Sequence, residues 1–395
     1  MRRGAPLAAA AVLLAGAAAA PVQAAPPQTQ GAAAIVVDAR DGAVIYQKRP
    51  DDRRAIASTT KLMTAMLALE RARPGQVYTA PAYNALPVES KINLRQGERM
   101  RVSDLLEALL LESANDAAVT IAEGVAGSRA AFVEEMNARA GELALADSSF
   151  ANPIGLDDSE NYSSARDLAK LSVQLMRNRR FARIVDQPKA VLESGSRRRV
   201  VANRNKLVAR FPFVDGIKTG HTLNADYVLV GAAAGRGGAR VVSVVLGEPS
   251  EAARDSDTVS LLRFGLSQFR RSRVLVRGRP VARLDVEHRD PPAPVAADRS
   301  VTATVRKGQR LERRIDVPDQ IEGPIEKGER LGSVTVLRGR ERIARANLVA
   351  AEEVPGPGIV RRVGGPFTLV LALAILAGAA IATMRLRAKS RTGAG

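Results

Sequence analysis

The chain contains no cysteine, and aromatic residues make up only 3% of its 395 residues. Without cysteine there is no disulfide framework, no thiolate metal site and no cysteine nucleophile, so the fold has to be held together by packing alone. Scarce aromatic rings also leave few platforms on which nucleic-acid bases could stack. Both absences argue against thiol chemistry and against a nucleic-acid partner.

Histidine is scarce as well, because the chain has only His221 and His288. A Ser-His-Asp catalytic system would have to rest on His221, since His288 falls in a segment without other catalytic-looking residues. Metal sites lack imidazole ligands for the same reason. We therefore expect no metal site built on histidine.

Positive charge exceeds negative charge, with 59 Lys and Arg against 41 Asp and Glu and a formal net charge of +18. The arginines are scattered rather than gathered into one basic stretch. Attraction to anionic lipid or to a wall polymer is one reading of this charge. The other is compositional bias on solvated faces that bind no partner, and charge alone does not choose between them.

The first 24 residues have the pattern of a secretory signal peptide. Arg2 and Arg3 are followed by an Ala/Leu/Val run through Ala20, and small residues end the segment at Ala24. A basic start, an apolar middle and a small-residue cleavage site are the features of such signals. A first membrane helix is the alternative, but the apolar stretch is short. We predict a signal peptide over residues 1–24 and export of the chain.

A second apolar run lies near the other end, over residues 366–384. About 19 uncharged residues are enough to cross a hydrocarbon core of ~30 Å as a helix. Four basic side chains follow the run within residues 385–395, whereas only Arg361 and Arg362 precede it closely. Because basic residues favour the cytoplasmic side, we expect a single-pass membrane protein with a cytoplasmic tail at 385–395 and an extracytoplasmic body.

Two folded segments are expected between these ends. β-rich runs occur near residues 34–46 and again near 215–246, and amphipathic helical patterns lie between them. Strands from both ends of this segment can join in one sheet with helices packed on it, so we predict an α/β domain over residues 33–268. From 274 to 353 the pattern changes to short β runs separated by Gly and Pro turns, which predicts a small β-rich domain.

Three short motifs in the α/β segment are candidates for catalysis: Ser58-Thr59-Thr60-Lys61, Ser113-Ala114-Asn115 and Lys218-Thr219-Gly220. Each motif alone is weak evidence, because a helix cap or a turn explains it equally well. Their order along the chain, however, matches the S-x-x-K, S-x-N and K-T-G set of penicillin-binding proteins. Together they indicate a serine enzyme.

The spacing of the first motif suits nucleophilic catalysis. Residues i and i+3 share one face of a helix, so the Lys61 amine can reach the Ser58 hydroxyl and accept its proton. An ordinary lysine has a pKa near 10.4 and would stay protonated. We expect desolvation and the positive charge of Lys218 to hold Lys61 neutral. The Ser58 amide, at a helix N-terminus, and the His221 amide are candidate donors to an oxyanion.

The chain resembles low-molecular-mass penicillin-binding proteins of the D-alanyl-D-alanine carboxypeptidase family, which carry an appended β-rich C-terminal domain. Several stretches besides the three motifs carry this resemblance: Leu62-Met63-Thr64, Asn115-Asp116-Ala117-Ala118, Met136-Asn137, Asn152-Pro153-Ile154-Gly155-Leu156-Asp157, Ser163-Ser164-Ala165-Arg166-Asp167 and Asp215-Gly216-Ile217-Lys218-Thr219-Gly220-His221-Thr222. The resemblance covers nearly the whole mature chain. It implies a serine β-lactamase/transpeptidase-like catalytic domain built on a central antiparallel sheet.

The resemblance also implies a role for each motif residue. Ser58 would be the acylated nucleophile, Lys61 its base and Ser113 a proton relay toward the leaving group. The Asn115 amide would hold the substrate backbone. Lys218 and Thr219 would bind the terminal carboxylate.

The third motif ends at Gly220, where the chain needs close backbone approach to the substrate. His221 follows it, as in the family's K-T-G-H-T, and we expect it to act through its backbone rather than as a base. Asp226 stands where the family commonly has glycine. We expect that carboxylate to pair with an arginine such as Arg204.

The implied function is hydrolytic removal of the terminal D-alanine from peptidoglycan pentapeptide stems during cell-wall synthesis, remodelling and shape maintenance. β-Lactams would act as mimics that acylate Ser58, and this hydrolysis would need no metal, nucleotide or organic cofactor. A D,D-endopeptidase or transpeptidase on the same fold is the enzymatic alternative, and a class A β-lactamase shares two of the motifs. From a different class, a non-catalytic wall-binding scaffold would keep the fold but does not need Ser58 and Lys61.

Overall fold

The computed structural model describes residues 26–287, 289–356 and 366–391. The chain divides into two compact units, up to Gln268 and from Phe269 onward. The expected signal peptide, residues 1–24, lies outside the described residues.

A five-stranded antiparallel sheet forms the centre of the first unit. Its strands follow the order β2-β1-β11-β10-β9. They are β1 (Ala33–Asp38), β2 (Val44–Lys48), β9 (Val214–Thr222), β10 (Asp226–Ala234) and β11 (Arg240–Glu248). The two ends of the unit meet where β1 pairs with β11, with Ile35 opposite Val244. The α/β fold with a central antiparallel sheet is therefore confirmed.

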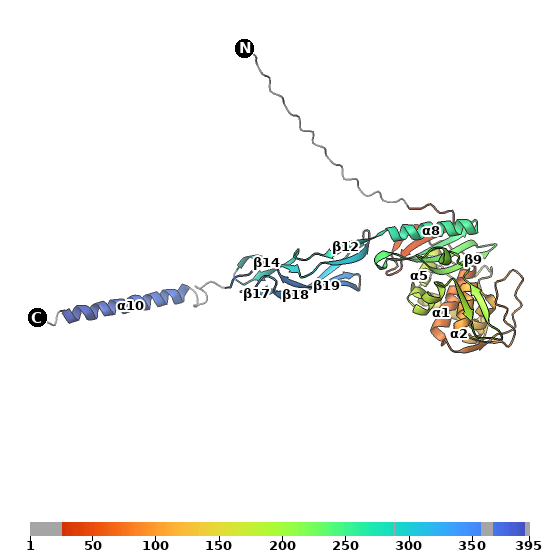
Figure 1. The fold of residues 1–395 in the computed structure, drawn as a ribbon, viewed down its shortest axis with the longest axis horizontal. Coiled ribbons are helices and arrows are strands. Elements are labelled where there is room, and N and C mark those ends of the chain that lie inside the picture. The colour runs from red at the N-terminus through yellow and green to blue at the C-terminus, as the bar shows by residue number, and fades with distance from the viewer. Residues whose placement is uncertain (1–25, 288, 357–365, 392–395) are drawn as a thin grey trace, which may run out of the picture. The chain divides into compact units, whose positions relative to one another are not determined.

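Both faces of this sheet are covered by helices (Figure 1). Ile35 lines one face together with residues of helix α5 (Ala165–Met176). On the other face, Val241 packs against Gly265 of helix α8 (Glu251–Ser267). Successive side chains of a strand point to opposite faces, so the central strand β11 carries apolar residues on both faces and is buried along most of its length.

A cluster of helices and short strands fills the segment between β2 and β9. Helix α1 is its centre, with eight consecutive buried residues starting at Lys61. Besides α5, the helical elements of this segment are η1 (Ala57–Thr60), α1 (Lys61–Arg71), α2 (Val102–Glu107), η2 (Ala108–Glu112), α3 (Asn115–Ala126), α4 (Arg129–Glu142), α6 (Arg179–Val185) and α7 (Leu207–Arg210), whereas η3 (Arg236–Gly238) lies between β10 and β11. Three strand pairs join them: β3 (Arg54–Ala55) with β6 (Tyr162–Ser163), β4 (Val77–Thr79) with β5 (Arg99–Arg101), and β7 (Lys189–Leu192) with β8 (Arg199–Ala202).

The second unit is rich in strands and has a core of its own, in which Val295, Val334 and Leu348 are fully buried. Strands β12 (Phe269–Leu275) and β15 (Val301–Arg306) form one pair. A six-stranded sheet contains β16 (Glu312–Asp316), β18 (Arg330–Arg338), β19 (Glu341–Ala350), β14 (Arg289–Ala297), β13 (Pro280–Val286) and β17 (Gln320–Ile321), in that order. The β-rich character of this segment is confirmed.

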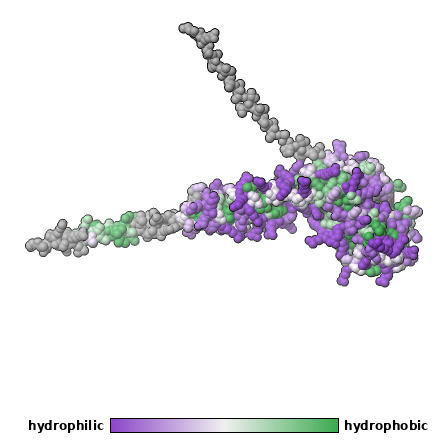
Figure 2. All heavy atoms as spheres, viewed as in Figure 1, coloured by the Kyte–Doolittle hydropathy of each residue, from purple (hydrophilic) through white to green (hydrophobic). Residues whose placement is uncertain are grey.

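The apolar run near the C-terminus forms helix α10 (Pro366–Arg391). Its described apolar side chains, drawn in green in Figure 2, are exposed, among them Val370, Leu373 and Leu376 at 59–66%. Among the residues that the structure describes, no helix combines the length and the apolarity needed to cross a membrane.

Candidate active site

Ser58 lies on the short 3-10 turn η1, directly before helix α1. Ala57, the residue before it, has a left-handed backbone with φ of 47°. Gly155 packs against this turn so closely that a Cβ atom there would lie 2.0 Å from the Ala57 carbonyl oxygen. Such strained, tightly packed backbone is typical of functional sites. The left-handed backbone at Ala57 and the close packing of Gly155 together fix the position of Ser58.

Lys61 lies one turn after Ser58, and its Nζ is 2.9 Å from the serine Oγ. The same Nζ donates to the carbonyl oxygen of Ile154 at 2.5 Å. Burial, and next the charge of Lys218, hold the pKa of Lys61 well below its ordinary value. A neutral amine in contact with a hydroxyl is the arrangement that a general base requires.

The S-x-N motif follows the π-helical turn η2 and leads into helix α3. Ser113 takes a left-handed backbone with φ of 63°. Its Oγ is buried and makes no hydrogen bond within the described part of the chain. Asn115 is the first residue of α3, and its Nδ2 donates to the carboxylate of Glu89 at 2.6 Å. An orphaned buried hydroxyl costs free energy, which is consistent with a partner that arrives with the substrate.

The K-T-G motif lies on strand β9 at the edge of the sheet. The Lys218 side chain is 1% exposed, and its Nζ donates to the Thr219 carbonyl oxygen at 2.9 Å. Burial, together with the charges of Arg204 and Arg254, lowers the pKa of Lys218 to about 7. Near neutral pH this lysine is therefore poised between its charged and its neutral form.

Gly220, which ends this motif, and His221, which follows it, line the cleft beside Ser58. A Cβ atom on Gly220 would lie 2.9 Å from the Ser58 backbone nitrogen. The exposed His221 ring stacks on Tyr227, with ring centroids 4.1 Å apart. That ring contact is a side-chain role for His221 that the sequence analysis did not foresee.

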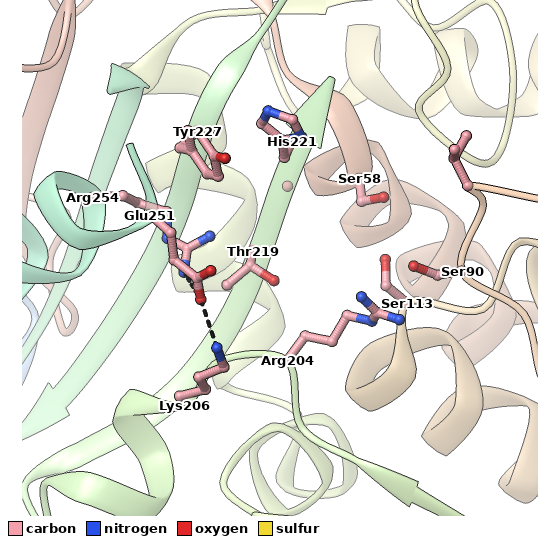
Figure 3. A pocket seen from close by; sticks show the side chains of 12 residues that line it. Ser58, Ser90, Ser113, Arg204, Lys206, Thr219, His221, Tyr227, Glu251 and Arg254 are labelled. Atoms are coloured by element: carbon pink, nitrogen blue, oxygen red, sulfur yellow. Dashed lines mark hydrogen bonds and ion pairs between the residues drawn. The ribbon is translucent and has the colours of Figure 1, made fainter. Parts of the chain in front are cut away.

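These elements enclose one cleft of about 310 Å³. Five of the eight predicted residues line it: Ser58, Ser113, Thr219, Gly220 and His221. Figure 3 shows the side chains of Ser58 and Ser113 on one side of the cleft, with Thr219 and His221 of strand β9 on the other. Lys61 contacts Ser58 directly, and Lys218 and Asn115 neighbour lining residues in sequence. The fold thus brings all three motifs to one place.

Several charged residues of the cleft were not found from the sequence. Arg204, Lys206, Glu251 and Arg254 also line it, and Glu251 pairs with Lys206 and with Arg254. They come from two separate segments without a recognisable motif, so no sequence signal identified them as a site. The expected pairing of Arg204 with Asp226 is wrong, because Arg204 instead bonds the carboxylate and carbonyl oxygens of Glu112.

Comparisons with known proteins agree with this geometry. Residues 20–250 match the family model described as D-alanyl-D-alanine carboxypeptidase, and residues 269–356 match the C-terminal domain of penicillin-binding protein 5. The chain belongs to the D-alanyl-D-alanine carboxypeptidase family. It is a serine-type D-Ala-D-Ala carboxypeptidase of the penicillin-binding protein 5 kind, acting on peptidoglycan, with a transpeptidase-like catalytic domain and a β-rich C-terminal domain.

Curated relatives support the assignment of this carboxypeptidase over most of its length. D-alanyl-D-alanine carboxypeptidase DacF of Bacillus subtilis is 31% identical over 329 residues, which cover 81% of this chain and 84% of the relative. DacA of Haemophilus influenzae is 30% identical and covers 82% of this chain and 84% of its own.

Solved structures agree as well. Penicillin-binding protein 5 from Haemophilus influenzae superimposes with a TM-score of 0.61 at 29% identity, covering 84% of this carboxypeptidase and 99% of the solved chain. The Streptomyces K15 DD-transpeptidase gives a TM-score of 0.58 at 30% identity and covers 62% of this chain and 100% of its own.

Proposed function

We propose that this carboxypeptidase releases the terminal D-alanine of pentapeptide stems through an acyl-enzyme on Ser58. The observation that carries the proposal is the 2.9 Å contact between Ser58 Oγ and the buried Lys61 Nζ. As Ser58 Oγ attacks the carbonyl carbon of the penultimate D-alanine, its proton moves to Lys61. The backbone amides of Ser58 and His221 stabilise the oxyanion that forms.

Ser113 serves the second half of the reaction. The amide C–N bond breaks, and the departing D-alanine nitrogen takes a proton relayed from Lys61 through the Ser113 hydroxyl. Water then attacks the Ser58 ester, which releases the shortened stem and returns the proton to Ser58. The free Ser113 hydroxyl in the cleft supports this relay.

Lys218, Thr219 and Asn115 bind the substrate. A cationic Lys218 and the Thr219 hydroxyl hold the terminal carboxylate, and the Asn115 amide holds the peptide backbone. Arg204 and Arg254 also line this cleft, and their charges act on Lys218. Because a carboxylate stabilises the charged form of a neighbouring lysine, substrate binding raises the pKa of Lys218 above its value of about 7 in the free enzyme. β-Lactams carry a carboxylate and a reactive amide, and they acylate Ser58 by the same route.

Mass spectrometry tests this assignment. The full-length chain is incubated with a pentapeptide ending in D-Ala-D-Ala and, separately, with penicillin. We expect free D-alanine and a penicilloyl adduct on the Ser58 peptide, and Ser58→Ala removes both. A penicilloyl adduct without D-alanine release would point to a D,D-endopeptidase that forms the same acyl-enzyme from a different substrate, because a transpeptidase also expels D-alanine when it is acylated by the pentapeptide. Adduct formation on Ser58→Ala would overturn the assignment.

We further propose that the chain is exported by a signal peptide at 1–24 and held in the membrane by residues 366–384, with residues 385–395 in the cytoplasm. The catalytic segment 33–268 and the β-rich segment 274–353 then face the extracytoplasmic side. The uncharged run and the exposed apolar side chains of α10 support the anchor. Truncation after residue 356 should move the protein from the membrane pellet to the soluble fraction; an unchanged pellet would refute the anchor.

A further inference from the structure

The loop between strands β4 and β5 is tied to the start of helix α3 by hydrogen bonds at several points. The Asn115 backbone N–H donates to the Ser90 carbonyl oxygen at 2.8 Å. The Asp116 carboxylate accepts from the backbone N–H groups of Ile92 at 3.1 Å and Leu94 at 2.9 Å. These bonds join backbone to backbone or carboxylate to backbone, so they fix the loop against the S-x-N motif.

Glu89 adds a side-chain contact within the same loop. Its Oε2 accepts from Asn115 Nδ2 at 2.6 Å and from the Tyr83 hydroxyl. Its Oε1 accepts from the backbone N–H of Leu86 at 2.9 Å. Three donors from different positions therefore hold both carboxylate oxygens, and the carboxylate has little freedom to turn away from Asn115.

This contact decides which way the Asn115 amide points. A carboxylate only accepts hydrogen bonds, so it bonds the NH2 end of the amide and excludes the flipped arrangement. The Asn115 Oδ1 is consequently directed away from Glu89, where it can accept a backbone N–H of a peptide. The bond to an ionised acceptor is also stronger than one to a neutral acceptor.

We propose that Glu89 is a positioning residue of the carboxypeptidase reaction, which locks the Asn115 amide so that its Oδ1 receives a backbone N–H of the stem peptide. The inference rests on the substrate-binding role proposed above for Asn115. Glu89 does not touch the reacting atoms and acts through Asn115.

The carboxylate has a second, electrostatic effect that gives the test a distinctive readout. The charged groups that act on Lys61 are Lys218 and Arg204, which lower its pKa, and Glu89 and Asp116, which raise it. Removing the charge of Glu89 lowers the pKa of Lys61 further. The neutral base then becomes available at lower pH.

The experiment measures the second-order rate of penicillin acylation by the full-length chain across pH. Glu89→Gln keeps the size of the side chain but permits both orientations of the Asn115 amide and removes the charge. We expect the rate to fall roughly 10-fold, the size of effect of a lost charge-assisted hydrogen bond. The acid limb of the profile moves to lower pH. Tyr83→Phe, which removes one donor to Glu89, should lower the rate by a smaller factor.

Controls separate positioning from loss of fold and from the role of Asn115. Asn84→Ala changes an exposed residue of the same loop and should leave rate and profile unchanged. In an Asn115→Ala background, Glu89→Gln should change the plateau rate less than about 2-fold, because positioning by Glu89 acts only through Asn115. A strong defect in Asn115→Ala with a wild-type rate and profile in Glu89→Gln would overturn this inference alone. A wild-type rate in Asn115→Ala would overturn the proposed role of Asn115 and this inference with it.

Discussion

Gly220 lies against the backbone amide of Ser58, so close that a Cβ atom at position 220 would be 2.9 Å from the Ser58 nitrogen. The substrate strand and the nucleophile are therefore in direct backbone contact. The amide of His221 is one residue further along the same strand. We expect the amides of Ser58 and His221 to donate to the same oxygen, as an oxyanion hole requires.

Gly220→Ala should abolish most catalysis without unfolding the protein. The added methyl group would also lie 2.8 Å from Val228 Cγ2 and 3.0 Å from the Ala57 Cβ, so strand and turn must separate. We expect penicillin acylation to fall at least ~100-fold, as when an oxyanion donor is lost. Stopped-flow acylation and thermal unfolding measure the two effects. Gly75→Ala, where a Cβ meets nothing within 4 Å, is the matched control. Acylation at the wild-type rate in Gly220→Ala would show that catalysis does not depend on the close contact between Gly220 and Ser58.

Arg204→Gln should move both limbs of the pH profile of acylation to higher pH. Lys61 must be neutral to act as base, so the rate rises with pH through its pKa. Lys218 must be charged to hold a carboxylate, so the rate falls above its pKa of about 7. Arg204 lowers the pKa of both lysines, in addition to the larger effect of burial, and its removal raises both.

The matched control for this profile is Arg198→Gln. Arg198 is an exposed arginine that pairs with Glu193, and its loss should shift neither limb. Limbs that stay in place in Arg204→Gln would show that its charge does not reach the two lysines.

The stability of the protein should fall as the pH rises toward neutrality because of Glu248. This carboxyl is fully buried, and burial together with the neighbouring Asp257 raises its pKa to about 7. The folded state binds the proton more tightly than the unfolded state, whose pKa is 4.5. The stabilisation is therefore complete below pH ~4.5 and is lost as the pH rises through about 7.

Thermal unfolding between pH ~5 and ~8 tests this effect. We expect the Tm of the wild-type protein to fall by roughly 5 °C across that range. Glu248→Gln, which cannot ionise at this position, should not show this fall. Glu160→Gln, at an exposed position, should leave the decrease unchanged. An equal pH dependence in wild type and Glu248→Gln would exclude Glu248 as its source.

The two units should respond separately to a core mutation. Leu348 is fully buried in the core of the β-rich unit. Leu348→Ala should destabilise that unit by about 2–5 kcal/mol through lost contacts and a cavity. Calorimetry should show that the unfolding transition of the β-rich unit moves to a lower temperature. The catalytic unit should still form a penicilloyl adduct at 25 °C. Loss of acylation when the β-rich unit unfolds would show that the two cores are not independent.

Much of the catalytic fold and site was readable from sequence, because its signals are local. The spacing of Ser58 and Lys61 predicts their contact, since one helical turn brings i and i+3 together. Alternating and continuous apolar runs predict the strands. Arg254 was not identified and Arg204 was named only as a partner of Asp226, because both reach the cleft from segments that only the packed fold brings together.

The sequence by itself determined the three motifs, the absence of thiol chemistry and the α/β order of the catalytic segment, since residue type and short-range spacing carry that information. Only the tertiary structure decided that burial lowers the pKa of both lysines and which way the Asn115 amide points. Desolvation and charge act through space, so the pKa of Lys61 depends on Lys218, 157 positions later in the chain, and on burial that the whole unit provides. The bond between Glu89 and Asn115 likewise exists only because a loop folds back onto helix α3.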